Sequence, residues 1–136
     1  MSIPSVLKRE VIKRAKSRCK YCGLAQVGQE AAFHIDHVVP VTLKGPTALD
    51  NLALACVSCS LRKGARTLAA DPKTGRKAAL FNPREQLWSE HFSWRGVWVI
   101  GRSETGRATI AALRLNRALI LAIRSEETLR HRHPPD

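Results

Sequence analysis

The stretch Phe33-His34-Ile35-Asp36-His37-Val38-Val39-Pro40 lies between two Cys-x-x-Cys pairs, Cys19-Lys20-Tyr21-Cys22 and Cys56-Val57-Ser58-Cys59. A two-residue spacer lets both sulfur atoms of a pair bind one ion, and four thiolates complete a tetrahedron around Zn²⁺. Two disulfides or a redox pair are the alternatives, but disulfide frameworks are typical of secreted proteins, and no feature of the sequence indicates secretion. The spacing therefore predicts a structural zinc site at Cys19, Cys22, Cys56 and Cys59.

The residues around this stretch predict a short ββα unit. Ala31–Val39 is apolar and rich in strand formers, so we expect a strand that ends at Pro40. Lys44-Gly45-Pro46 marks a turn, and Leu52–Ala55 predicts a second strand. A helix is expected to start at Leu61–Arg66, after the second cysteine pair. The order is cysteine pair, strand, loop, strand, cysteine pair, helix, so one zinc ion would clamp the unit at both ends.

Elements are also expected on both sides of this unit. Pro4–Ser17 has the apolar spacing of an amphipathic helix. Asp71–Pro83 is expected to be a loop, followed by a hairpin of Phe92–Trp94 and Val97–Ile100 that turns at Arg95-Gly96. Two helices should follow, one from Thr105 and one to about Arg130, separated near Asn116-Arg117, with a frayed tail at His133–Pro135. The fold class is therefore α+β, with a zinc-stapled ββα core in residues 1–70 and a C-terminal extension in 71–136 that packs on it.

The aromatic residues of this extension are expected to form a small core, packed on the ββα unit or on the two helices. They are Trp88, His91, Phe92, Trp94 and Trp98. Stacking on nucleic-acid bases is the alternative, but buried aromatic rings are the default in a domain of this size.

Charge is the most informative bulk property. The 136 residues contain 23 Lys and Arg against 11 Asp and Glu, a formal net charge of +12. Such an excess favours a polyanionic partner through phosphate contacts, although a merely soluble basic protein has the same composition. The longest purely apolar runs, Leu52–Val57 and Ala118–Ile123, are too short to cross a bilayer. No apolar signal core follows Met1, so we expect a cytoplasmic protein without a membrane partner.

The central segment resembles the HNH endonuclease family, in the subgroup with four zinc-binding cysteines. That pattern runs C-x-x-C, D-H-x-x-P, N-L, then C-x-x-C with a polar residue and x-x-K, and it falls on Cys19–Lys63. Asp36-His37-x-x-Pro40 and Asn51-Leu52 occupy the expected places in the expected order. The resemblance implies a ββα-metal fold and the metal-dependent hydrolysis of phosphodiester bonds in DNA.

The resemblance also assigns roles in that chemistry. It makes His37 the general base, a suitable role because histidine as a residue type titrates near neutral pH. It makes Asp36 a ligand of a catalytic Mg²⁺ or Mn²⁺, a hard cation that prefers oxygen donors. Adjacent side chains of a strand point to opposite faces, so a bend or an approach from the side must bring both residues to one site.

Three further residues complete the candidate site. Asn51 matches the family residue that ties a loop together and helps to hold the base. Ser60 departs from the family, which has His or Asn directly after the last cysteine to complete the catalytic metal site, and a serine hydroxyl is a weaker ligand. His34 shares a strand face with Asp36 and is a candidate metal ligand, a group that orients a metal ligand, or a phosphate contact. A partly buried strand histidine is the alternative for His34.

Basic side chains beside the second cysteine pair are candidates for nucleic-acid binding. They are Arg62, Lys63 and Arg66, for which ordinary helix-surface charge is the alternative. The sequence as a whole predicts a metal-dependent DNA endonuclease with His37 as general base. The alternative is a non-catalytic zinc module that binds nucleic acid, in which Ser60 marks a decayed site.

Overall fold

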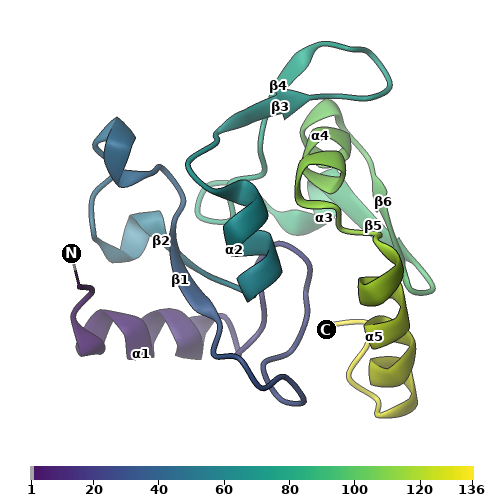
Figure 1. Cartoon of the computed structure of the whole chain (residues 1–136), viewed down its shortest axis with the longest axis horizontal. Coiled ribbons are helices and arrows are strands. Elements are labelled where there is room, and N and C mark those ends of the chain that lie inside the picture. The colour runs from purple at the N-terminus through teal and green to yellow at the C-terminus, as the bar shows by residue number, and fades with distance from the viewer. Residues whose placement is uncertain (1) are drawn as a thin grey trace. The chain divides into compact units, whose positions relative to one another are not determined.

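The computed structural model describes residues 2–136, which form two compact units (Figure 1). Unit 1 comprises Met1–Thr67 and Asn82–Glu85, and unit 2 comprises Leu68–Phe81 and Gln86–Asp136. Both units combine helices with small antiparallel sheets of two strands, which confirms the α+β prediction. The predicted domain boundary and the packing of the extension on the core stay predictions. No helix within residues 2–136 is both long enough and apolar enough to span a membrane.

Unit 1 is built on an antiparallel pair of strands. Its elements in chain order are α1 (Ser5–Arg14), β1 (His34–His37), η1 (Val41–Leu43), η2 (Leu49–Asn51), β2 (Leu52–Ala55) and α2 (Val57–Lys63). β1 pairs with β2 over its whole length, with His34 opposite Ala55 and His37 opposite Leu52. The sequence thus predicted β2 to the residue and the ββα order correctly.

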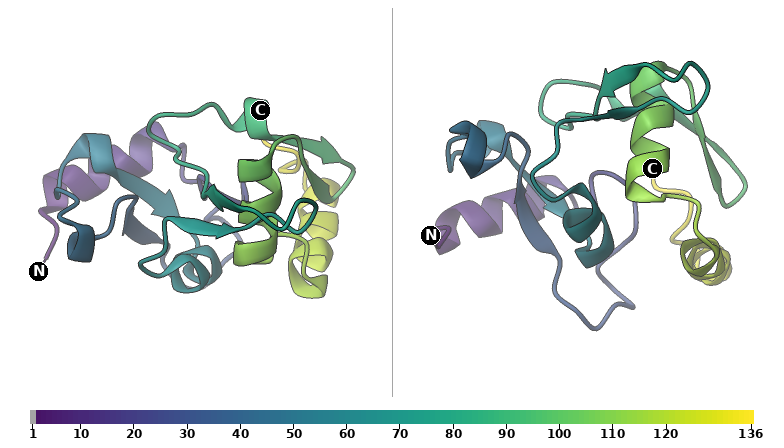
Figure 2. Two further views of the ribbon diagram at one scale, coloured as in Figure 1. Left: turned by 90° about the horizontal axis from the view of Figure 1, so that it is seen from above. Right: turned by 45° about the horizontal axis from the view of Figure 1, so that its top comes forward.

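The two helices of this unit lie on opposite faces of the strand pair (Figure 1; Figure 2). α1 contributes to a core of buried residues, Val11, Ala15, Leu52 and Leu54, against which Ile35 also packs. Neighbouring strand side chains point to opposite faces, so Asp36 points away from that core. It meets Lys63 at the end of α2 instead. One face of the strands is therefore hydrophobic, and the other holds buried charges.

The boundaries of α1 and β1 differ from the predicted ones. α1 ends at Arg14, not Ser17, because Lys16 and Ser17 adopt left-handed backbone conformations (φ 53° and 56°) that cannot continue a helix. β1 covers four residues rather than Ala31–Val39. Its partner has only four residues, and the next amide, of Val38, donates to the Asn51 carbonyl in the loop. The length of β1 is thus set by its partner.

α2 also starts earlier than predicted, at Val57 rather than near Leu61. Cys56 caps it, because its sulfur accepts a hydrogen bond from the Cys59 amide at 3.4 Å. The helix ends where Gly64 takes a positive φ of 54°, which a residue without a side chain adopts at little cost. The second cysteine pair is therefore part of the helix and not a loop before it.

Unit 2 contains two hairpins and three helices. Its elements are β3 (Leu68–Ala70), β4 (Lys77–Ala79), α3 (Trp88–His91), β5 (Phe92–Arg95), β6 (Trp98–Gly101), α4 (Glu104–Leu113) and α5 (Ala118–Leu129). The predicted hairpin and the break between the last two helices are confirmed within about a residue. The prediction of a loop over Asp71–Pro83 is wrong, because β4 lies within it and pairs with β3.

Aromatic rings form a cluster within unit 2, as predicted. Trp88 stacks on Phe92 and on Trp94, with ring centroids 5.0 and 4.9 Å apart. Trp98 was predicted to join this cluster but is 48% exposed. The tail is not frayed as predicted, since His133 packs edge-on against Trp94 at 4.6 Å and bonds to the Gly96 carbonyl. Ring packing thus ties the end of the chain to the β5–β6 hairpin.

An ion pair joins the β3–β4 hairpin to α4. Asp71 is fully buried and accepts two hydrogen bonds from Arg107, at 3.0 and 2.9 Å. The hydrogen bonds from Arg107 lower the pKa of Asp71 well below its usual value. A lowered folded-state pKa stabilises the protein above the unfolded pKa of about 3.9, and that contribution disappears as the pH falls through the folded value.

We therefore expect Asp71→Asn to lower the melting temperature of unit 2 at neutral pH. Replacing the carboxylate removes the charge partner of Arg107 and leaves one neutral acceptor oxygen in place of two charged ones. The difference in melting temperature between the variant and the wild type should shrink as the pH falls below about 4, because the Asp71 carboxyl of the unfolded wild-type chain then begins to take up a proton while the folded one stays ionised. Thermal unfolding followed by tryptophan fluorescence across that pH range measures it. A difference that does not change with pH would contradict this account.

Candidate metal centre and active-site groove

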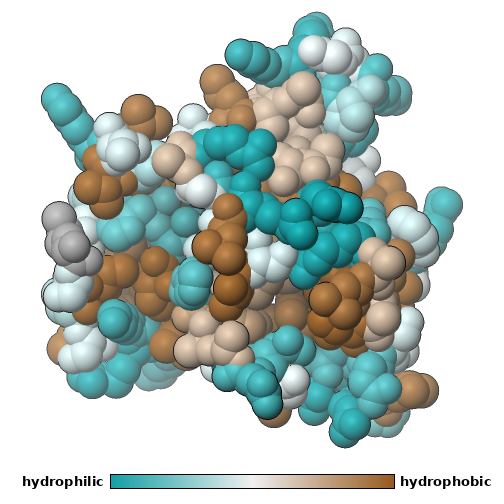
Figure 3. Space-filling model, in the orientation of Figure 1, coloured by the Kyte–Doolittle hydropathy of each residue, from teal (hydrophilic) through white to brown (hydrophobic). Residues whose placement is uncertain are grey.

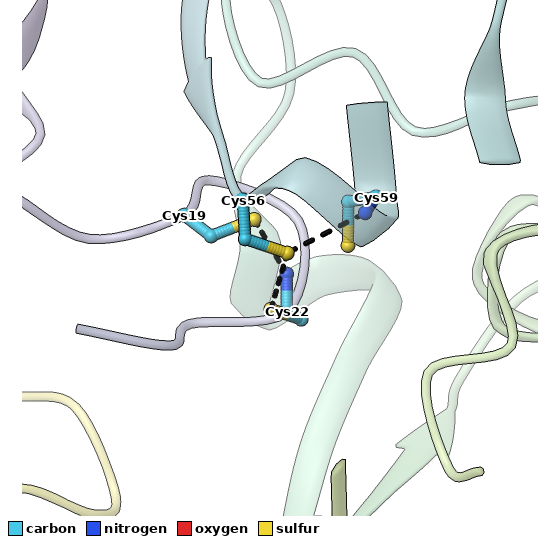
Figure 4. A group of neighbouring side chains, drawn as sticks. All are labelled: Cys19, Cys22, Cys56 and Cys59. Carbon is cyan, nitrogen blue, oxygen red and sulfur yellow. Dashed lines mark hydrogen bonds between the residues drawn. The ribbon is translucent and has the colours of Figure 1, made fainter. Parts of the chain in front are cut away.

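The four cysteines come together as predicted from their spacing. All four are buried, and their sulfur atoms lie within 4.8 Å of one another (Figure 4). The Sγ atoms of Cys22 and Cys56 are 3.7 Å apart, far longer than a disulfide bond. Four sulfurs at 2.3 Å from one zinc ion lie about 3.8 Å apart, so this separation fits a tetrahedral zinc site.

Backbone hydrogen bonds hold the two cysteine pairs in this arrangement. In the first pair the Cys19 amide donates a hydrogen bond to the Leu24 carbonyl at 2.8 Å, and the Gly23 amide donates one to the Cys19 carbonyl at 3.0 Å. The Lys20 amide donates to the Leu54 carbonyl of β2, which fixes this turn beside the second pair. The site thus joins the N-terminal segment to the start of α2.

The thiols also show why this cluster favours a cation. Hydrogen bonding from Cys19 and Cys56 raises the pKa of the Cys22 thiol, whereas bonding from Cys19 and Cys22 lowers the pKa of Cys56. A bound Zn²⁺ supplies the positive charge that four thiolates require.

The candidate catalytic residues line one open groove of unit 1. The cavity has a volume of about 760 Å³, and His34, Asp36, His37 and Ser60 are among its lining residues. Asp36 and His37 reach the same groove although they are neighbours in β1. His37 is the last residue of that strand, where the chain leaves the ladder for the following loop.

His37 is oriented by a residue that the sequence did not single out. Its Nε2 atom lies 2.9 Å from the Oγ1 atom of Thr47, in the loop between β1 and β2. If Nε2 carries the hydrogen and donates to this hydroxyl, the lone pair of Nδ1 is available to accept a proton. No local pattern in the sequence indicates Thr47, because the contact joins residues ten positions apart across a loop.

Asn51 fastens this loop. Its side-chain oxygen accepts from the Val39 amide at 2.9 Å, and its side-chain nitrogen donates to the carbonyls of Val39 and Pro46 at 3.0 and 2.9 Å. Gly45 allows the close approach, since a Cβ atom there would lie 1.8 Å from the Val39 carbonyl oxygen. The turn at Lys44-Gly45-Pro46 was predicted, but this need for glycine was not.

Asp36 is held from two sides inside unit 1. The Tyr21 hydroxyl donates to its Oδ2 atom at 2.9 Å, and the Lys63 ammonium lies 3.2 Å from the same oxygen. Burial raises the pKa of Asp36, while the charge of Lys63 and the hydrogen bond from Tyr21 act to lower it. Both contacts reach Oδ2, so Oδ1 takes part in neither.

Lys63 is buried, whereas the phosphate contact predicted for it requires a side chain at the surface. Its side chain is only 2% exposed, and its ammonium also donates to the His37 carbonyl at 3.2 Å. The inner face of α2 thus places Lys63 beneath β1, where it compensates the charge of Asp36 and cannot meet a phosphate at the surface. Arg66 is exposed, and Arg62 is half-buried with its Nε atom bonded to Ser58, so these two remain candidates for phosphate contacts.

Ser60 and His34 meet at the groove. The Nδ1 atom of the exposed His34 lies 2.9 Å from the Ser60 hydroxyl. The residue that departs from the family pattern is therefore paired with a second potential ligand. Among residues 2–136, the only cluster of three or more His, Cys, Asp or Glu ligands is that of the four cysteines. A catalytic cation would rest on a smaller donor set, Asp36, His34 and Ser60, completed by water.

Comparison with known protein families agrees with this arrangement. Residues 19–66 match the family model described as HNH endonuclease, which confirms the resemblance predicted for this segment. The match covers about a third of the 136 residues and includes both cysteine pairs and the groove residues from His34 to Ser60. No curated protein and no solved structure matches the chain.

Two asparagines allow a matched test of the groove loop. Asn116 binds the backbone of β6 in the way that Asn51 binds the backbone of the loop. The Asn116 side chain accepts from the Val99 amide at 2.9 Å and donates to the Val99 carbonyl at 2.8 Å. We expect Asn51→Ala and Asn116→Ala each to cost about 1–3 kcal/mol of unfolding free energy, because each leaves backbone groups unsatisfied. Only Asn51→Ala should also reduce nucleic-acid cleavage. Urea unfolding and cleavage assays on both variants measure this, and equal cleavage would contradict a role for the loop.

Proposed function

We propose that this chain is a metal-dependent endonuclease that hydrolyses phosphodiester bonds in DNA, with His37 as the general base. The observation that carries the proposal is the groove in which His34, Asp36, His37 and Ser60 meet. The family match over residues 19–66 and the net charge of +12 support a nucleic-acid substrate. The Cys₄ site would hold a structural Zn²⁺ that keeps β2 and α2 in place around the groove.

In this proposal the residues of the chain position the water and the phosphate. Thr47 holds the imidazole of His37 by one nitrogen, and the other takes a proton from the attacking water. Asn51 keeps the loop closed behind the histidine. Asp36, with Ser60 and His34, would hold a divalent cation, Mg²⁺ or Mn²⁺, which would supply charge stabilisation at the phosphoryl oxygens and the departing oxygen. Arg62 and Arg66 contact flanking phosphates.

A non-catalytic zinc module that binds nucleic acid is the second candidate. Two observations favour it: serine at position 60, where the family has a stronger ligand, and the engagement of Asp36 by Lys63. This candidate predicts salt-sensitive DNA binding without cleavage. The Ser60→Asn variant tests whether weak binding of the catalytic cation is the sole cause of absent cleavage, since a side-chain amide oxygen offers a better ligand at that position.

Plasmid cleavage with different cations tests the endonuclease proposal. Zinc-loaded protein should nick or cut plasmid DNA with Mn²⁺ or Mg²⁺ and not with EDTA. Because His34 offers a nitrogen donor, Mn²⁺ should support a higher rate than Mg²⁺, which prefers an all-oxygen shell. Folded, zinc-loaded protein that cleaves with neither cation, before or after Ser60→Asn, would overturn the proposal in favour of the binding module.

A further inference from the structure

The groove of unit 1 runs along the free edge of β1. β1 pairs with a single neighbour, β2, so one of its edges is covered and the other is not. His34 and Asp36 line the groove from one face of the segment 33–37. Phe33 and Ile35 line it from the other face, because neighbouring side chains of an extended chain alternate. A cavity that both faces of a strand line lies at the edge that no other strand covers.

The groove has an apolar lining beside the candidate catalytic residues. The members of the apolar lining are Ile3, Ile12, Phe33, Ile35 and Val41. Ile3, Phe33 and Ile35 also pack against the core that α1 forms with β2. Ile12 and Val41 are 39% and 51% exposed. Hydrophobic side chains gather at the surface of the part of the molecule that α1 and β1 occupy (Figure 3), so the core of unit 1 continues to the surface at this groove.

The position of Phe33 in this lining is fixed by Gln26. The side-chain oxygen of Gln26 accepts from the Phe33 amide at 2.7 Å, and its side-chain nitrogen donates to the Ala31 carbonyl at 3.0 Å. The segment that leads into β1 is thus bonded to the turn after the first cysteine pair. A contact surface that is already ordered costs less conformational entropy when a ligand binds. The apolar lining is therefore a preformed surface.

A positive charge lies at the same groove. Lys8 lines it and is exposed, and Ile12 follows four positions later, so the two side chains are neighbours on one face of α1. Within residues 2–136, Lys8 forms no ion pair with a carboxylate. The groove thus combines an apolar surface, a cation and the candidate catalytic residues. A ligand complementary to all three carries flat apolar groups and an anion close together.

We propose that the groove binds a stretch of nucleic acid whose bases are unpaired. Its phosphate lies at Lys8 and the candidate catalytic residues, and its bases lie against the apolar lining. Proteins that bind single strands combine positive charge with side chains on which the faces of the bases pack. In a duplex those faces are stacked on one another, so they are not free to contact the lining. The nucleic acid as ligand rests on the proposed function.

The size of the groove agrees with one strand rather than two. Its volume of about 760 Å³ is in the range of pockets that hold small molecules, about 300–1,000 Å³, which suits a few nucleotides and not a turn of duplex. The substrate class is therefore DNA with unpaired bases at the cleaved strand, either a single strand or a locally opened duplex. A negatively supercoiled plasmid belongs to this class, because supercoiling favours opening of the duplex.

Strands with and without bases test the contact with the apolar lining. Zinc-loaded protein is mixed with a fluorescein-labelled single strand, with its duplex, or with the same strand carrying abasic sites. No Mg²⁺ or Mn²⁺ is added, so that fluorescence anisotropy measures binding without cutting. The abasic strand keeps every phosphate but lacks the base faces, so it should bind more weakly than the intact strand by a factor of about 5–150. The duplex should also bind more weakly than the intact strand.

Matched substitutions test the residues of the groove. Val41→Ser should weaken binding of the intact strand, whereas Val27→Ser, at an exposed valine of unit 1 that does not line the groove, should not. Phe33→Leu keeps an apolar side chain against the core and should weaken binding of the intact strand more than that of the abasic strand. Lys8→Gln should reduce the slope of log affinity against log salt by about 0.7. Lys13→Gln, on the same helix but away from the groove, should reduce it less.

Two outcomes would overturn the inference. Equal affinities for the intact and the abasic strand would mean that the groove contacts phosphates alone. Tight binding of the intact strand that Val41→Ser and Phe33→Leu leave unchanged would leave the apolar lining to a partner protein.

Cleavage separates this inference from the proposed function, because the affinities are measured without a catalytic cation. A protein that cuts relaxed, fully paired duplex as fast as single strand would remove the inference and keep the endonuclease. Base-dependent binding without any cleavage would keep the inference and remove the endonuclease.

Discussion

Removal of zinc is expected to unfold unit 1. The four cysteines are buried and join the turn after α1 to the junction of β2 and α2, so without the ion these segments lose their common anchor. A structural zinc site is worth about 10–16 kcal/mol in small zinc domains, which exceeds or equals the whole stability of many domains. Treatment with phenanthroline should therefore abolish much of the far-ultraviolet circular dichroism signal of unit 1, in parallel with release of one zinc ion measured by mass spectrometry.

The distribution of aromatic residues lets the two units be followed separately. All three tryptophans lie in unit 2, and the single tyrosine, Tyr21, lies in unit 1 between the zinc-binding cysteines. Chelation should change the absorption of Tyr21 and leave tryptophan emission nearly unchanged, because the stacking of Trp88 on Phe92 and Trp94 is made within unit 2.

Two point substitutions, one of a zinc ligand and one of a neighbouring residue, provide a matched control for the chelator. Cys22→Ser should reproduce the effect of chelation, whereas Ser58→Ala, within the second cysteine pair, should keep its zinc. If the chelator removed only a catalytic cation, added Mn²⁺ should restore cleavage. If it removed the structural zinc ion, added Zn²⁺ should be needed. A Cys22→Ser protein with wild-type stability would contradict a structural role for the ion.

The features of this site that could be predicted from the sequence are those set by local geometry. Two Cys-x-x-Cys pairs predict a metal site because the ligand spacing is fixed by the ion itself. β2 was predicted to the residue because Leu52–Ala55 is a short apolar run with clear ends. β1 was predicted too long because its ends depend on its partner strand, which the local pattern does not contain.

The features that could not be predicted depend on contacts between distant residues. Lys63 has the sequence context of a surface lysine near a helix end, yet it is buried because α2 turns that face toward Asp36. Tyr21 was interpreted only as a spacer residue between two cysteines, but its hydroxyl binds Asp36. Burial without a partner costs a charged group several kcal/mol, so the tyrosine and the lysine are what allow an aspartate at this depth. The sequence located the groove residues, and packing decides which of them face solvent.

His37→Ala is expected to reduce the rate of DNA cleavage by a factor of about 10²–10⁴, the usual contribution of a positioned general base. This corresponds to about 3–5 kcal/mol of transition-state stabilisation. Zinc content should not change, because His37 is not part of the cysteine cluster. Folding stability should change little, since the imidazole is only half-buried and its side chain is held by a hydrogen bond to the Thr47 hydroxyl. Single-turnover cleavage of plasmid with saturating Mn²⁺ measures the rate.

Two histidine variants separate the base from other effects. His91 lies in unit 2 with its Nδ1 atom 2.7 Å from the Ser103 hydroxyl, so His91→Ala also removes an imidazole from a hydroxyl partner and should leave the cleavage rate unchanged. His34→Ala should weaken cleavage mainly through metal affinity and recover at higher Mn²⁺ concentration. His37→Ala should not recover with metal but should recover in part with added imidazole, which supplies the missing base. Recovery of His37→Ala by Mn²⁺ alone would assign this histidine to the metal site and leave the base to another residue of the groove.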